Sequence, residues 1–190
     1  MRRSHEARLA PLREDVLERL GEVGARGVAN IAHGAAKAGL RSRPPWDALW
    51  EGLGSAARGR MGEFDPQALS NTSWAFAKAG HAAPALFEAV AAATAPRVGE
   101  FNPQDLANTA WAFATAGHAA PALLDAVAAA AAARAGEFNP QNLANTAWAF
   151  ATAGHAAPAL FDAVAAEAAG RTGGRTSAAR GLCERSCRAD

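Results

Sequence analysis

Residues 100–136 read EFNPQDLANTAWAFATAGHAAPALLDAVAAAAAARAG, and this stretch decides the fold because the chain repeats it with a 37-residue period. Similar copies fill residues 63–99 and 137–173, and the last two copies differ at only five positions. A fixed period of this length is typical of stacked arrays, since one unit alone cannot bury its apolar faces. The expected units are 1–27 (a truncated repeat with an N-terminal helix over about residues 8–23), 28–62 (degenerate repeat with a four-residue insertion in 40–46), 63–99, 100–136, 137–173 and 174–190 (disordered basic tail).

Each copy contains the start and end signals of two helices. Asn102 precedes Pro103, and an Asn N-cap followed by Pro at the first helical position is a strong helix start. Gly117 fits the left-handed position that ends a helix, and Pro121 opens a second helix that we expect to end near Gly136. We therefore predict an all-α fold, an α-solenoid of tandem 37-residue helical hairpins.

The chemistry-bearing residues do not suggest an enzyme. The two cysteines, Cys183 and Cys187, stand in the tail, and no phosphate-binding glycine loop, catalytic triad or cluster of metal ligands is recognisable. No apolar run is long enough to cross a membrane. We expect no catalytic residues, no metal, no cofactor and no membrane partner, and the cysteine usage suggests a reducing compartment.

One stripe of the first helix carries amides and indoles at i, i+4, i+7 and i+11. Side by side along an array, these side chains would form one continuous surface, here called the polar row. Helical-repeat proteins that bind RNA use such surfaces, in which polar groups contact base edges and planar groups stack on bases. The polar row comprises Gln67, Asn71, Trp74 and Lys78, then Gln104, Asn108, Trp111 and Thr115, then Gln141, Asn145, Trp148 and Thr152.

A structural interpretation of the polar row stays open beside the functional one. Each Trp could fill the gap between adjacent repeats, and each Asn could bond to neighbouring backbone as a ladder. If the row does contact bases, near-identical repeats should choose identical bases, which favours a near-homopolymeric tract. The position that varies most is Ala68, Asp105 and Asn142, where an acid would also suit the helix dipole.

Two further residue types recur once per copy. The histidines His81, His118 and His155 follow the first helix, and equivalent positions on neighbouring helices lie too far apart to share a metal ion easily. A capping or packing role is therefore expected for them. Arg97, Arg134 and Arg171 could contact phosphates, or could serve the helix dipole and pair with Glu63, Glu100 and Glu137.

The string LANTAWAFA at 106–114, preceded by FNPQ at 101–104, resembles the helical repeats of octotricopeptide-repeat and RAP-domain proteins. It is more loosely similar to the FAST-kinase-like repeats of organelle RNA factors. The resemblance spans about residues 28–173. It implies binding to single-stranded RNA in a mitochondrion or chloroplast, with an effect on RNA processing, stability or translation.

The charge distribution leaves two alternatives to RNA binding. Residues 1–60 carry ten Arg and one Lys against seven acids, whereas residues 61–173 carry three Arg and one Lys against nine acids. The acidic repeats favour a protein–protein interaction scaffold, and the abrupt tail favours an inactive fragment of a longer array. A basic, indole-bearing polar row would favour RNA over a protein partner.

Overall fold

The computed structural model describes residues 2–171, and its side-chain detail covers residues 11–171. This described part is all-helical and contains no strand. Residues 158–171 are helical as well, and the tail expected at 174–190 lies outside the described residues. The elements in order are α1 (Arg2–Arg19), α2 (Ala25–Lys37), α3 (Asp47–Arg58), η1 (Met61–Glu63), α4 (Pro66–Ala79), α5 (Pro84–Thr94), η2 (Ala95–Glu100), α6 (Pro103–Ala116), α7 (Pro121–Ala133), η3 (Ala135–Glu137) and α8 (Pro140–Ala153).

The expected helix starts and stops are confirmed at the first helix of each regular copy. The Asn102 side-chain oxygen accepts the backbone N–H of Asp105 at 2.9 Å, and Pro103 opens α6. Gly117 follows α6 with φ 63°, a left-handed conformation that glycine adopts without a Cβ clash. The backbone N–H of His118 then reaches back to the carbonyl of Phe113 at 3.2 Å, which satisfies a free carbonyl at the helix end.

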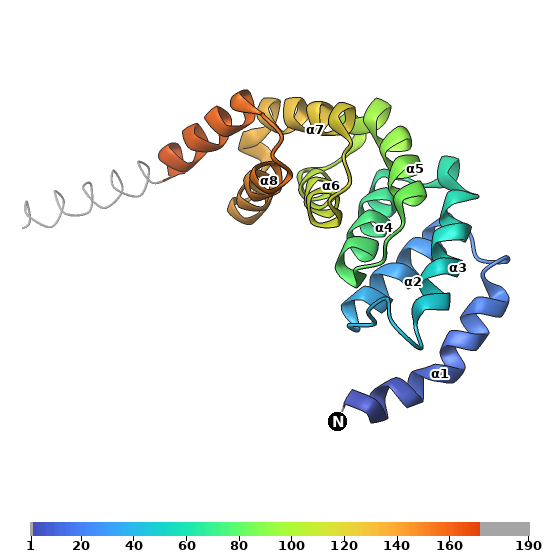
Figure 1. The fold of residues 1–190 in the computed structure, drawn as a ribbon. Coiled ribbons are helices and arrows are strands. Elements are labelled where there is room, and N and C mark those ends of the chain that lie inside the picture. Colours follow the sequence, from blue (N-terminus) through green and yellow to red (C-terminus); the bar gives the residue numbers. More distant parts are fainter. Residues whose placement is uncertain (1, 172–190) are drawn as a thin grey trace, which may run out of the picture.

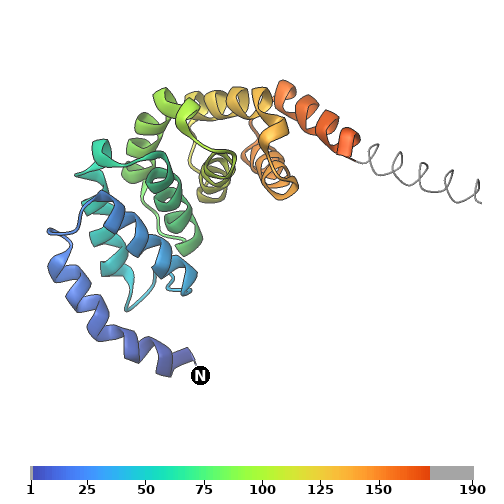
Figure 2. The same cartoon turned by 180° about the vertical axis from the view of Figure 1, so that it is seen from behind.

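The helices form two layers along a curve (Figures 1 and 2). The first helices of successive units, α2, α4, α6 and α8, lie side by side on the inner side of the curve. The second helices, α3, α5 and α7, lie on the outer side and contact one another in the same order, with α1 placed before α3. Each unit inside the described array therefore contacts the unit before and the unit after it.

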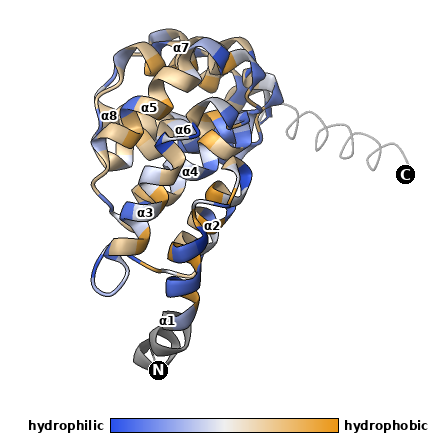
Figure 3. Ribbon diagram, turned by 90° about the vertical axis from the view of Figure 1, so that its right-hand side faces the viewer, coloured by the Kyte–Doolittle hydropathy of each residue, from blue (hydrophilic) through white to orange (hydrophobic). Residues whose placement is uncertain are grey.

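The core runs the length of the array. The Phe residues that precede and that end each first helix are almost fully buried: Phe64, Phe76, Phe101, Phe113, Phe138 and Phe150. Alanines fill the spaces between helices, since Ala75, Ala110 and Ala112 have no exposed surface. Figure 3 shows hydrophobic residues spread over all the labelled helices from α2 to α8 rather than gathered at one centre. Few large side chains and many small ones therefore allow closely packed helices.

Two expected boundaries need correction. The second helices end earlier than Gly99 and Gly136, because α5 stops at Thr94 and α7 at Ala133, and each is followed by a 3₁₀ turn. Pro96 lacks the N–H that would continue α5, which explains the first of these ends. The N-terminal helix, expected over about residues 8–23, instead runs from Arg2 to Arg19.

Candidate nucleic-acid interface

The polar row coincides with the solvent-facing stripe of the first helices. On α4 every residue except Pro66 and the four row members is buried, because α2, α6 and the outer layer cover the other sides. The α4 members Gln67 and Lys78 are exposed, while Asn71 and Trp74 are half-buried. The row therefore lies on the inner side of the curve, away from the second helices.

The three asparagines of the row keep their amides available. Asn71, Asn108 and Asn145 are half-buried on α4, α6 and α8. Among residues 11–171, none of their side chains has a hydrogen bond to the protein, so the backbone ladder considered for them does not form. A half-buried amide without a protein partner offers both a donor and an acceptor to a ligand.

The aromatic rings of the row form a ladder, in which the N-terminal rings contact one another and the last ring is exposed. The ring centroids of His33 and Trp74 lie 4.9 Å apart, and those of Trp74 and Trp111 lie 6.2 Å apart. Both indoles pack partly against the core, as expected for a Trp between adjacent repeats. Trp148 differs, since 49% of its surface is exposed and no ring contact joins it to Trp111 in the described part.

The sequence prediction missed four members of this surface. Arg26, Asn30, His33 and Lys37 occupy on α2 the places that Gln67, Asn71, Trp74 and Lys78 occupy on α4, each 41 residues earlier. The signal was available, because Asn30 and Lys37 already aligned with the later copies. His33 was missed because the later copies have Trp at its position. The ring contact with Trp74 shows that an imidazole takes the place of an indole there.

With these four α2 residues included, the side chains of the polar row carry no negative charge and a few positive charges. The row contains no carboxylate, and its cations, Arg26, Lys37 and Lys78, all lie toward the N-terminal end. Arg26 donates to Asp65 at 2.9 Å, and this contact, after the backbone N–H of Ala68, lowers the pKa of that carboxyl. Burial and then the Lys37 charge lower the pKa of His33, so this imidazole is neutral at pH 7.

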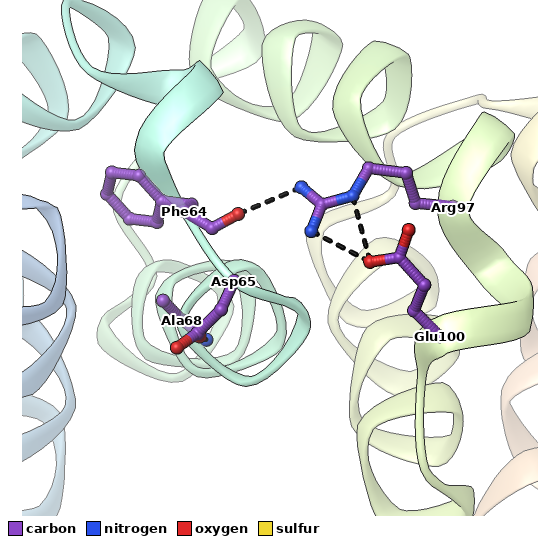
Figure 4. Close-up of polar contacts among 5 residues, drawn as sticks. All are labelled: Phe64, Asp65, Ala68, Arg97 and Glu100. Atoms are coloured by element: carbon purple, nitrogen blue, oxygen red, sulfur yellow. Dashed lines mark hydrogen bonds and ion pairs between the residues drawn. The ribbon is translucent and has the colours of Figure 1, made fainter.

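The recurring arginines act within the protein. Arg97 donates through Nη1 to the carbonyl oxygen of Phe64 at 2.9 Å and forms a two-pronged ion pair with Glu100 (Figure 4). Arg134 does the same with Phe101 and Glu137. The expected Arg–Glu pairing is therefore confirmed for these two. Arg171 also donates to its Phe carbonyl, that of Phe138 at 2.6 Å, but its acidic partner is Glu167.

The recurring histidines have the packing role expected of them. Each lies edge-on against the Phe that ends the first helix of its own copy, with ring centroids 5.6 to 5.9 Å apart. His81 also contacts the Ser42 hydroxyl at 2.6 Å, and His155 contacts a carboxylate oxygen of Asp125 at 2.8 Å. Burial lowers the pKa of His81.

Small cavities lie between neighbouring copies at these turns. His81 and His118 line one of about 500 Å³, and His118 and His155 line another of about 320 Å³. Thr115 and Thr152, the last members of the polar row on α6 and α8, also line them. The polar row therefore reaches one of these cavities at each of two junctions between neighbouring copies.

No group of three or more His, Cys, Asp or Glu side chains within the described part is placed to hold a metal ion. No described helix has both the length and the apolar character that crossing a membrane requires.

These observations define a protein of stacked helical hairpins whose first helices share one polar and aromatic surface. The chain matches the family model described as RNA-editing substrate-binding complex 6 protein over residues 12–170, and it belongs to that family. This supports the RNA-associated helical protein that the sequence resemblance implied, although the octotricopeptide-repeat, RAP-domain and FAST-kinase-like families are not the family that matched. No curated protein matches the chain significantly.

Proposed function

We propose that the chain is an α-solenoid that binds single-stranded RNA along the polar row. The observation that carries the proposal is the set of three unpartnered amides, Asn71, Asn108 and Asn145, on the solvent-facing stripe of stacked helices. Single-stranded RNA presents unpaired base edges that such amides recognise, and an exposed indole offers a stacking surface.

The placement of charge agrees with this proposal. The acids that make residues 61–173 negative lie off the row, at repeat starts where Glu100 and Glu137 pair with arginines, or on the outer helices, as Glu88 and Asp125 do. A phosphate backbone that follows the inner side of the curve meets the cations of α2 and α4 and no carboxylate of the row. The net acidity of the repeats therefore does not oppose RNA on this face.

The family description names an RNA-editing substrate-binding complex, which favours a non-enzymatic role in RNA processing with both RNA and protein partners. The sequence resemblance adds an organelle, mitochondrion or chloroplast, as the place of action. Because the copies at 100–136 and 137–173 share the same row residues, we expect both to prefer the same nucleotide. The preferred target is then a near-homopolymeric tract.

The test is binding of the purified chain to labelled single-stranded homopolymers of A, U, C and G at ~50 and ~200 mM salt. The expected result is preference for one homopolymer that survives the higher salt and is lost in the double variant Asn108→Ala, Asn145→Ala. Glu88→Gln on the outer layer is the matched control and should bind as the wild type does.

Two other results would contradict the proposal. Equal binding to all four homopolymers that collapses at the higher salt would assign the affinity to the arginine-rich ends of the chain. No binding at either salt concentration would leave a protein-interaction scaffold as the better explanation of the surface that the copies repeat.

A further inference from the structure

At the N-terminal end of the described array, a second helix, α1, comes before the first complete hairpin. Helix α1 contacts α3 in the same way that α3 contacts α5, so α1 occupies the place of a second helix. In the described residues no first helix accompanies it. The face of α2 that points away from α4 is consequently not covered by a neighbour of its own kind.

Burial at equivalent positions shows the difference. On α4 this face contains Thr72 and Ala75, which have no exposed surface because α2 packs there. The corresponding residues of α2 are Ile31, which is half-buried, and Gly34, which is exposed. The same helix face is thus covered inside the array and open at its end.

An apolar groove marks the open place. It has a volume of about 300 Å³ and lies between α1 and α2, with Leu12, Val16, Ile31, Leu40 and Trp46 among its lining residues. Leu12 is 56% exposed, which is the highest value for a large hydrophobic side chain in residues 11–171. The groove therefore presents uncovered apolar surface.

We propose that this groove binds a single amphipathic helix of a partner protein. The chain itself shows what fits: the helix face that covers α4 carries Ala29, Ala32 and Ala36, all buried. The partner helix should present small residues at this i, i+3, i+7 spacing toward α2 and a large apolar residue toward Leu12.

A second copy of the chain does not fit this groove as well. Among the described residues, α8 also has an uncovered face, on which Ala144 and Ala151 are exposed. Helix α8 is followed directly by the helix at 158–171, which would take the outer position that α1 already fills. A lone helix avoids this overlap, so a partner helix is the occupant that the geometry favours.

Gly34 provides a clean way to close the groove. Glycine weakens a helix relative to alanine, and the regular copies have alanine at this position, as in Ala75. Gly34 lines the groove, and a Cβ built on it meets no atom within 4 Å, so a side chain added there starts from open space in the groove. Gly170, exposed in the helix at 158–171 and equally unobstructed, is the matched control.

The probe is a synthetic peptide with the sequence of residues 101–118, a first helix with its cap residues, titrated calorimetrically into the full chain. Saturable binding is expected, with a loss of about tenfold or more in Gly34→Leu and no change in Gly170→Leu. A peptide carrying Ala107→Glu and Ala110→Glu, which puts charge on its small-residue face, should not bind.

Three outcomes would overturn the proposal. The first is the absence of saturable binding by the wild-type chain. The second is binding that Gly34→Leu leaves intact and Ala147→Leu abolishes, which would put the peptide on the open face of α8. The third is concentration-dependent dimerisation in sedimentation that Gly34→Leu abolishes, since the occupant would then be a second copy. None of these measurements depends on RNA.

Discussion

The indole rings of Trp74 and Trp111 lie 6.2 Å apart and are tilted by 35°, so the rings of two adjacent repeats contact each other. The rings of His33 and Trp74 lie 4.9 Å apart and are tilted by 38°, and these spacings leave no room for a base between the rings. Trp148, with 49% of its surface exposed, is the ladder member with a free face in the described part. The ladder therefore divides into a packed segment and one open stacking platform.

From this division we predict that substitution of Trp111 affects mainly stability, whereas substitution of Trp148 affects mainly RNA binding. Trp111→Ala should lower the free energy of unfolding by about 1–3 kcal/mol, because a core-packed ring is lost. Trp148→Ala should cost less than about 1 kcal/mol but should weaken RNA binding by removing a stacking surface. Chemical denaturation and RNA titration of both variants check this. Equal stability losses with equal RNA affinity would contradict it.

Replacing Arg134 by Met should destabilise the array by about 1–2 kcal/mol, because the part-buried carbonyl of Phe101 loses its donor. Glu137→Gln should have a smaller effect, since the ion pair is solvent-exposed while the bond from Arg134 to Phe101 remains. Thermal unfolding followed by circular dichroism distinguishes the two. A larger loss for Glu137→Gln would show that the ion pair, not the carbonyl contact, holds the turn.

Asp105→Asn should stabilise the protein at neutral pH. Burial raises the pKa of Asp105, with the nearby Asp65 charge contributing, so the folded state binds a proton more tightly than the unfolded chain does. Stability from this residue is therefore greatest below the ordinary aspartate pKa of about 4 and falls as pH rises through the raised value. The gain, about 1 kcal/mol or less, should shrink as pH is lowered. Denaturation midpoints at pH 4 and pH 7 test it, and a gain that grows at pH 4 would refute the burial argument.

Gly117→Ala should destabilise by about 1 kcal/mol, because φ 63° brings a Cβ too close to the following carbonyl. The space around this Cβ is otherwise open, so the cost is one of backbone conformation alone. Gly99→Ala is the control, since Gly99 is equally unobstructed and does not have a positive φ. Comparable denaturation midpoints for the two variants would argue against the left-handed turn.

The sequence predicted the helices well where a local rule acts on a single residue. An Asn or Asp before Pro and a glycine fourteen residues after that Pro were sufficient to place α4, α6 and α8, because caps depend on neighbouring residues only. The end of α7 at Ala133 was not predictable in this way, since its alanine run has no stop signal and the helix ends where Arg134 turns toward Phe101.

The polar row was predicted by periodicity, but its internal differences were not. Helical spacing identifies Trp74, Trp111 and Trp148 as equivalent, and it cannot show which of them a following helix will cover. That depends on position in the array, since α6 is flanked on both sides and α8 on one. The same reasoning explains why His33 was missed, because its role follows from contact with Trp74 rather than from its residue type.

The arginine contacts allow the number of 37-residue blocks in the chain to change. Arg97 bonds to a carbonyl 33 residues before it and to Glu100, three residues after it, so every bond it makes stays within about one period of the chain. Duplicating or deleting one 37-residue block reproduces these bonds unchanged at the new junction. If the polar row binds RNA as proposed, recombination between near-identical blocks would change the number of nucleotides that the array contacts, while both ends of the chain keep their sequence.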